Sequence, residues 1–168
     1  MIFNWTKWHI SSAEEANEAF DKIAQIHPKY HAFDTETTGL NFEFERLTEI
    51  GAVEVSNFEI GEKFNTLVNP QKPIPAKITE ITGISDEMVK CAPDEKQALE
   101  KFLNFVNGRV LVAHNAKFDF GFLTAVARRH NLDLNCLKTR WHLSHHASPL
   151  RTTTATWWRK YITATNAD

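Results

Sequence analysis

The chain has 168 residues, a length that suits one domain with a buried core. Its composition, 42% hydrophobic and 24% charged, is ordinary for a globular protein and excludes a disordered or fibrous one. No apolar run of about 18 residues is present, so no membrane span is expected. The first residues also lack the basic start and the apolar stretch of a secretory signal.

Cysteine usage and charge narrow the class further. Cys91 and Cys136 lie 45 residues apart without a CxxC partner, so we expect no disulfide, no zinc site and a reducing, cytoplasmic location. The net charge is −2, yet residues 134–168 hold five Lys or Arg and a single acid, Asp168. This basic tail either contacts phosphates or is a solvated end.

A helix and a short strand are expected first. Ser12, with Glu15 three residues later, is typical of a capping box. Apolar residues follow at helical spacing up to Ile26, and Pro28 ends the helix. Residues 30–34 are apolar and aromatic, which predicts a buried strand.

The middle of the chain predicts alternating strands and helices. The expected strands are 47–55, 62–68 and 110–113, the first two joined as a hairpin. The expected helices are 76–81, 86–90, 95–106 and one that begins near 118 and ends near 130. This order predicts a single α/β domain over 1–168, with a mixed sheet and helices on its faces. From about residue 134 the periodicity is poor, and a terminal helix over 152–162 is the element expected there.

Two carboxylates stand at the end of the first predicted strand. Asp34 and Glu36 are two residues apart, and in an extended chain such residues point to the same face. Two neighbouring anions resist ionisation unless a cation lies between them, and oxygen-rich sites of this kind select Mg²⁺ or Mn²⁺. The pair therefore indicates a metal site, and a polar strand terminus is the alternative interpretation.

A third acid follows another predicted strand. Asp119 comes directly after the segment VLVAHNAKF, early in the helix that leaves this strand. An acid at that place also complements the helix dipole. His114 and Asn115, in the same segment, have the alternative role of satisfying backbone groups of the loop.

Together these segments resemble the DEDD family of 3′→5′ exonucleases, which includes the proofreading subunit or domain of bacterial DNA polymerase III. The resemblance covers about residues 30–130. It rests on the segments AFDTETTGL (32–40), EIGAV (49–53), LVNP (67–70), ITGISDEMV (81–89) and VAHNAKFD (112–119). It implies a ribonuclease H-like mixed sheet with helices on both faces, two divalent ions (Mg²⁺ or Mn²⁺) and DNA 3′ ends as the substrate.

The resemblance also implies roles for individual residues. Asp34 and Glu36 would bind the metal pair, with Glu36 also near the attacking water, and Asp119 would help to hold the second ion. The residues implied to contact the 3′-terminal nucleotide are Thr37, Gly39, Leu40, Thr82 and Asn115. Leu40 would pack on a base, and Thr82 stands where the family often has His. For Asn115 a structural role in its loop is the alternative.

The third motif of this family is incomplete here. It supplies a general-base His and, five residues later, a final metal-binding Asp. His145 and His146 match the adjacent histidines of polymerase-type members, and His suits proton transfer near neutral pH. Five residues after them stand Leu150 and Arg151, neither of which ligates a metal.

Three explanations of this departure stay open. The tail is altered and the enzyme impaired, or Asp133 or Asp168 completes the site, or a partner supplies the missing ligand. The non-catalytic alternative is a module of the same fold that binds nucleic acid or a polymerase. An RNA-trimming exonuclease and an internally cleaving hydrolase are further alternatives. The expected partners are single-stranded or frayed DNA 3′ ends, RNA as the alternative, and a DNA polymerase, without a membrane.

Overall fold

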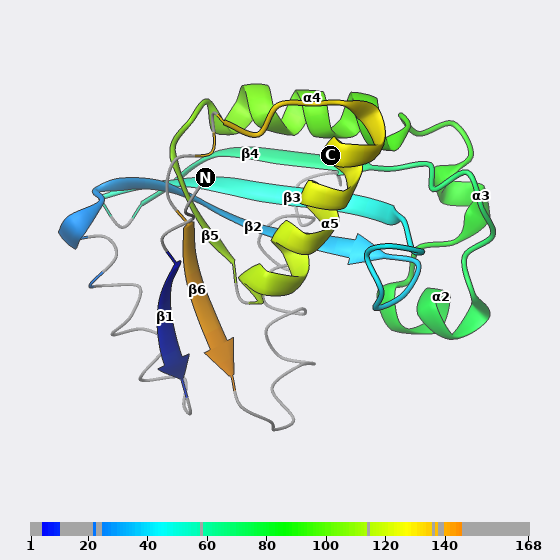
Figure 1. Ribbon diagram of the computed structural model, residues 1–168, viewed down its shortest axis with the longest axis horizontal. Helices are drawn as coiled ribbons and strands as arrows, with labels where there is room; N and C mark the ends of the chain where they lie inside the picture. The colour runs from blue at the N-terminus through cyan, green and yellow to red at the C-terminus, as the bar shows by residue number, and fades with distance from the viewer. Residues whose placement is uncertain are drawn as a thin grey trace.

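The computed structural model describes residues 22, 25–57, 59–113, 115–135 and 137, together with the backbone of 5–10 and 140–145. Within these ranges six strands form one mixed sheet in the order β1-β6-β5-β2-β3-β4 (Figure 1). The strands are β1 (Trp5–Ile10), β2 (Lys29–Thr37), β3 (Leu47–Ser56), β4 (Glu59–Leu67), β5 (Val110–Ala113) and β6 (Arg140–His145). The helices are α2 (Ala76–Thr82), α3 (Asp86–Val89), α4 (Glu95–Val106) and α5 (Ala116–His130).

Strand direction divides the sheet into two halves. β1, β6, β5 and β2 run parallel to one another, whereas β2, β3 and β4 form an antiparallel meander. This confirms the predicted α/β fold with a mixed sheet and a β3–β4 hairpin. β2 is longer than expected, because it continues through Thr37 and so includes both Asp34 and Glu36.

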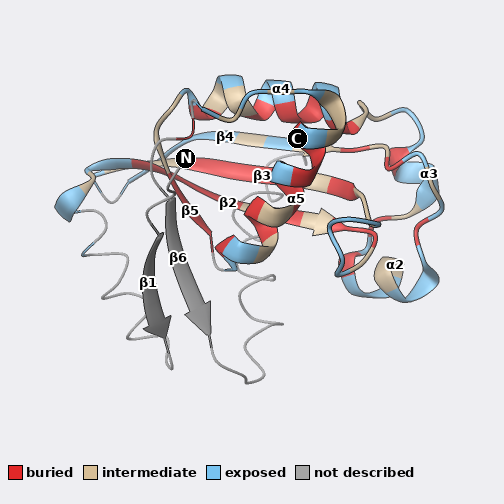
Figure 2. Ribbon diagram, viewed as in Figure 1, coloured by how far each residue is buried: buried red, intermediate tan, exposed pale blue. Residues whose placement is uncertain are grey.

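Helix α4 shows how the sequence specifies its element. Asp94 caps the first turn by accepting a hydrogen bond from the backbone N of Gln97 at 2.9 Å. Asn107 ends the helix in the left-handed conformation at φ 41°. Between these caps one stripe faces the sheet and is buried: Ala98, Leu99, Phe102 and Val106 (Figure 2).

The core centres on Phe33 of β2. Its ring lies 5.5 Å from that of Phe102 on α4 and 5.2 Å from that of Phe120 on α5, measured between centroids. Both helices therefore pack on the same face of the sheet. The helix expected over 12–27 lies largely outside the described residues, as does the helix expected over 152–162. None of the described helices is long and apolar enough to cross a membrane.

Two strands were not expected from the sequence. β1 pairs in parallel with β6, with Trp5 opposite Arg140, and β6 pairs in parallel with β5. The partners β1 and β6 are far apart in the chain, so neither carries a local turn signal that would reveal the pairing. The prediction of poor order from about residue 134 is therefore wrong for Arg140–His145. Cys91 is an exposed free thiol, as expected.

We expect Phe102→Ala to lower the free energy of unfolding by about 3–5 kcal/mol, because it empties the centre of the α4–sheet contact. Phe44→Ala is the matched control, since Phe44 is 73% exposed and its loss should cost less than about 0.5 kcal/mol. Urea unfolding followed by circular dichroism measures both. Equal losses for the two variants would contradict this placement of the core.

Candidate functional site at the carboxyl edge of the parallel strands

The acids predicted from the sequence meet where β2 outruns β5. The parallel pairing of these strands ends with Ala32 opposite Val112, β5 stops at Ala113, and α5 begins at Ala116. The end of β2 therefore lies beside the first turn of α5. In open α/β sheets, ligands bind outside the carboxyl ends of parallel strands.

Asp34 and Glu36 share one face of β2. Both are half-buried, whereas Phe33, Thr35 and Thr37 between and beside them are buried. This alternation follows from the two-residue repeat of a strand, and Phe33 identifies the buried face as the one under α4 and α5. The geometry thus agrees with the expectation that the two carboxylates lie on the same face.

Asp119 is tied to the residue between these two acids. Its Oδ1 accepts one hydrogen bond from the backbone N of Thr35 at 3.1 Å and another from the Thr35 hydroxyl at 2.7 Å. The side chain is buried, with 1% exposed, and Oδ2 has no hydrogen-bond partner. Thr35 is a site residue that the sequence reasoning missed. Its signal was a hydroxyl at the one position of the Asp34–Glu36 segment that faces α5.

Burial raises the pKa of Asp119 to about 7, since the ionised form loses its water. The Thr35 hydrogen bonds oppose this rise, and the negative charge of Glu36 adds to it. Asp119 and Glu36 therefore lie close enough to repel each other. A cation between them would relieve both the repulsion and the unpartnered oxygen.

The donors present are the kind that Mg²⁺ or Mn²⁺ prefers, all of them carboxylate oxygens. Among the described residues, however, no three His, Cys, Asp or Glu side chains already form a group that could hold a metal ion. The orphaned Oδ2 of Asp119 and its coupling to Glu36 fit a divalent ion in chemistry. The described acids would need to close around it or gain a further ligand.

The residues expected to meet a terminal nucleotide lie just beyond Glu36. Thr37 is buried and donates its hydroxyl to the carbonyl of Gly39 at 2.7 Å. Leu40 is 73% exposed. The turn at Thr37–Gly39 thus presents Leu40 to solvent, and substrate contact by these residues stays a prediction.

Thr82 and Asn115 have other neighbours. The Thr82 hydroxyl donates to the carbonyl of Ile78 at 2.9 Å and accepts from the N of Ile84 at 3.2 Å, so it finishes helix α2. Asn115 occupies the N-cap position of α5 without a side-chain capping bond and is exposed. These bonds give Thr82 a structural role. Asn115 lies next to the edge where β5 ends, and substrate contact by either residue stays a prediction.

The third motif is described only in part. β6 ends at His145 and extends beyond the pair Ala113–His142, so its backbone reaches the same edge of the sheet as Asp34 and Glu36. His114, His146, Leu150, Arg151 and Asp168 lie outside the described residues. Asp133 follows the far end of α5, about 16 Å of helix away from Asp119, and binds Asn135 instead. Asp133 therefore does not complete the site.

The pKa of Asp119 predicts a pH-dependent stability in metal-free buffer with EDTA. The carboxyl titrates near 3.8 when unfolded and at about 7 when folded, so its contribution is complete below the first value and is lost as pH rises through the second. We expect the free energy of unfolding to fall less steeply with rising pH, over this window, in Asp119→Asn than in the wild type. Glu62→Gln, at an exposed position, should keep the wild-type slope. Identical slopes in Asp119→Asn and wild type would contradict the buried carboxyl.

Comparison with solved structures identifies the fold. Exonuclease I of E. coli bound to a dA16 oligonucleotide superposes with a TM-score of 0.62 at 18% identity, covering 78% of this chain and 30% of that one. A ligand-free exonuclease I gives 0.63 over 78% and 31% of the two chains. The ribonuclease H-like α/β fold expected from the sequence is confirmed.

Curated relatives add sequence similarity. The PolC-type DNA polymerase III of Caldanaerobacter subterraneus subsp. tengcongensis is 44% identical over 124 residues, which are 73% of this chain and 9% of that protein. The Bacillus subtilis protein of the same name is 42% identical over 100 residues, 60% of this chain and 7% of that protein. The chain thus spans less than a tenth of the length of these relatives. The RNase_T family model, described as an exonuclease family, matches residues 32–153. The chain therefore belongs to the RNase_T exonuclease family.

Proposed function

We propose that the chain is a metal-dependent 3′→5′ exonuclease that removes nucleotides from DNA 3′ ends. The observation that carries this proposal is the locking of Asp119 onto Thr35, between Asp34 and Glu36, at the carboxyl edge of the parallel strands. An exonuclease family provides the reaction class. The similarity to PolC-type polymerases supports a proofreading or repair role beside a polymerase.

Asp34, Glu36 and Asp119 would hold two Mg²⁺ or Mn²⁺ ions. Such ions, when bound, lower the pKa of a water and neutralise charge on the phosphate. Hydrolysis adds the water oxygen to phosphorus and breaks the bond to the 3′ oxygen of the preceding nucleotide. The chain leaves with a 3′ hydroxyl, and the released nucleotide carries the phosphate.

The chain's own residues orient the groups around this reaction. Thr35 fixes one oxygen of Asp119 with two hydrogen bonds, which leaves the other oxygen available to the site. Glu36 lies on the same strand face as Asp34 and would accept from the attacking water. Leu40, exposed beyond the turn at Gly39, would stack on the terminal base.

A histidine would take the proton from the attacking water. His145 and His146 are the candidates, because an imidazole titrates near neutral pH and can alternate between base and acid. β6 brings the backbone of His145 to the carboxyl edge of the sheet, next to β5. This placement favours the two histidines over His130, which stands at the far end of α5.

A specific observation also favours a second function, binding without turnover. Arg151 stands five residues after His146, where the resembling family has its last acid. A guanidinium there would repel metal ions. A module that binds DNA, RNA or a polymerase without cleaving is therefore the second candidate.

A labelled-oligonucleotide assay separates the two candidates. We expect the purified chain, with Mg²⁺ or Mn²⁺, to shorten 5′-labelled single-stranded and 3′-recessed DNA one nucleotide at a time, and EDTA to stop the reaction. Asp34→Ala should lower the rate at least about 100-fold, because it removes an oxygen ligand of the ions. Glu62→Ala, an acid exposed on β4, is the matched control and should act like the wild type.

The outcomes are distinct. DNA binding without shortening by either metal would overturn the exonuclease and leave the binding module. Equal rates for Asp34→Ala and wild type would place the chemistry elsewhere or in a contaminant. A matched RNA oligonucleotide, run in parallel, decides which sugar the chain prefers.

A further inference from the structure

The segment from Thr38 to Arg46, named here the recognition loop, joins β2 to β3 and carries Gly39 and Leu40. It is closed at its base by a hydrogen bond from the N of Thr38 to the carbonyl of Arg46 at 2.8 Å. Inside the loop, the carbonyl of Asn41 accepts from the N of Phe44 at 3.1 Å and of Glu45 at 2.8 Å. The backbone of the loop is thus ordered by its own bonds while Leu40 faces solvent.

Glu95 lies behind this loop. It is the first residue of α4 and only 6% exposed, although it carries a carboxylate. Its Oε1 accepts from the N of Leu47, directly after the loop, at 3.0 Å. Such a buried charge needs partners, because an unpaired one is strongly disfavoured.

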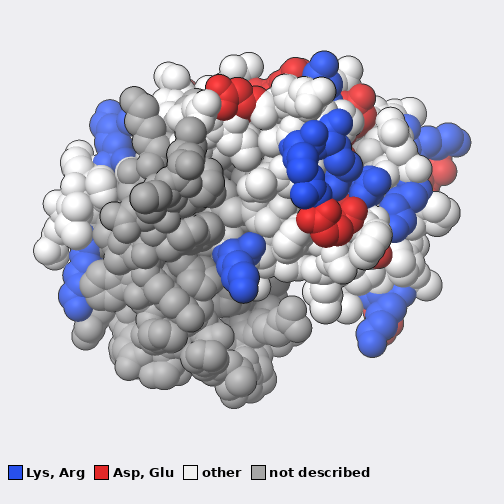
Figure 3. All heavy atoms as spheres, in the orientation of Figure 1, with Lys and Arg blue, Asp and Glu red and all other residues white. Residues whose placement is uncertain are grey.

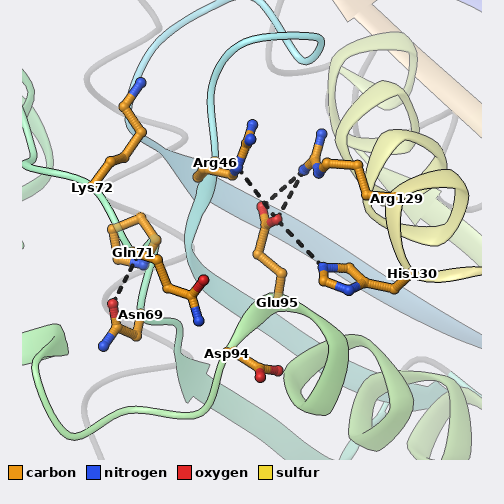
Figure 4. Close-up of a pocket in the computed structure, with 9 residues that line it drawn as sticks. Arg46, Asn69, Gln71, Lys72, Asp94, Glu95, Arg129 and His130 are labelled. Atoms are coloured by element: carbon orange, nitrogen blue, oxygen red, sulfur yellow. Dashed lines mark hydrogen bonds and ion pairs between the residues drawn. The ribbon is translucent and has the colours of Figure 1, made fainter.

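Arg129 of α5 supplies that partner and also reaches the loop. Its Nη2 donates to both oxygens of Glu95 at 3.0 Å, and its Nη1 donates to the carbonyl of Phe42 at 3.2 Å. Nε of Arg46 and Nε2 of His130 complete the cluster at 3.7 Å and 4.0 Å from Glu95 (Figure 4). One ion pair therefore holds the loop at its middle, through Phe42, and at its exit, through Leu47.

A pocket of about 260 Å³ opens beside this cluster, and its cations do not make it a phosphate site. Arg129 and Arg46 face Glu95, while Nζ of Lys72 is bound to Oε2 of Glu45 at 2.8 Å. On the face shown in Figure 3, Lys and Arg atoms lie beside Asp and Glu atoms rather than in a continuous basic stripe. The charges are spent on holding the loop.

We propose that Glu95 and Arg129 are positioning residues that fix the recognition loop and so set how tightly the chain holds the 3′-terminal nucleotide. The proposal rests on the proposed function, because it assigns Gly39 and Leu40 to that nucleotide. The reacting carboxylates are carried by β2 and α5 rather than by the loop. Loosening the loop therefore weakens binding in the ground and transition states alike, which raises KM and leaves kcat nearly unchanged.

The decisive variant is Arg129→Lys. A lysine keeps a positive charge beside Glu95 but has no second nitrogen for the carbonyl of Phe42. Arg128→Lys is the matched control, because the neighbouring Arg128 also reaches the loop, through Glu43, but in an exposed pair. Glu95→Gln removes the buried charge itself and tests the other half of the pair.

Kinetics and binding are measured on the full chain. Anisotropy of a 5′-labelled single-stranded DNA, with Ca²⁺ replacing Mg²⁺, gives Kd, and shortening with Mg²⁺ gives kcat and KM. We expect Arg129→Lys and Glu95→Gln to raise Kd and KM about 5- to 10-fold with kcat within about 2-fold, and Arg128→Lys to match the wild type. Hydrogen exchange should be faster at the backbone N–H groups of residues 44–47 in Arg129→Lys alone of the two lysine variants.

Unchanged Kd and KM in folded Arg129→Lys overturn the inference, as does a fall in kcat equal to the fall in kcat/KM. If Glu95→Gln does not fold, Arg129→Lys decides. A wild-type chain that neither binds nor shortens DNA overturns the proposed function itself. A wild-type chain that does both, with Arg129→Lys identical to it, overturns only the role of the ion pair.

Discussion

The pair of hydrogen bonds from Thr35 to Asp119 is the constraint on which the candidate site depends. These residues are 84 positions apart, and the bonds join the end of β2 to the first turn of α5. They place a buried carboxylate between two half-buried ones without help from any other described polar group. Because one oxygen of Asp119 is satisfied and the other is not, the same contact both orders the site and leaves it incomplete. Incomplete satisfaction of a buried acid is typical of a functional site.

Such an arrangement costs stability, and the surrounding packing offsets it. A buried carboxyl beside a second acid keeps its proton or requires a cation, since charge inside a low-dielectric region is poorly solvated. Directly behind it, the rings of Phe33, Phe102 and Phe120 meet in the largest cluster of buried side chains. The strand that carries the acids is thus anchored by its alternate residues. One strand serves the core with one face and the chemistry with the other.

A second buried charge follows a different principle. Glu95 is surrounded by donors, namely the N of Leu47, Arg129, Arg46 and His130, and its charge is neutralised. Buried pairs of this kind add little net stability but define geometry, because breaking one partner leaves the other uncompensated. Asp119 is poised for a ligand, whereas Glu95 is closed to one. The two acids illustrate how burial alone does not identify a metal site and how the number of donors around the carboxylate does.

The sequence by itself determined the α/β class, the elements from β2 to α5 and the three acids. Each of these rests on local information: two-residue alternation in Asp34–Glu36, capping by Asp94, and the helical stripe of α4. The family resemblance ordered the acids into one site because it carries the long-range information that periodicity lacks. Only the tertiary structure decided the pairing of β1 with β6, the contact of Thr35 with Asp119 and the link from Glu95 through Arg129 to Phe42. These join residues between 34 and 135 positions apart, and a contact between distant residues leaves no periodic pattern in the chain that makes it.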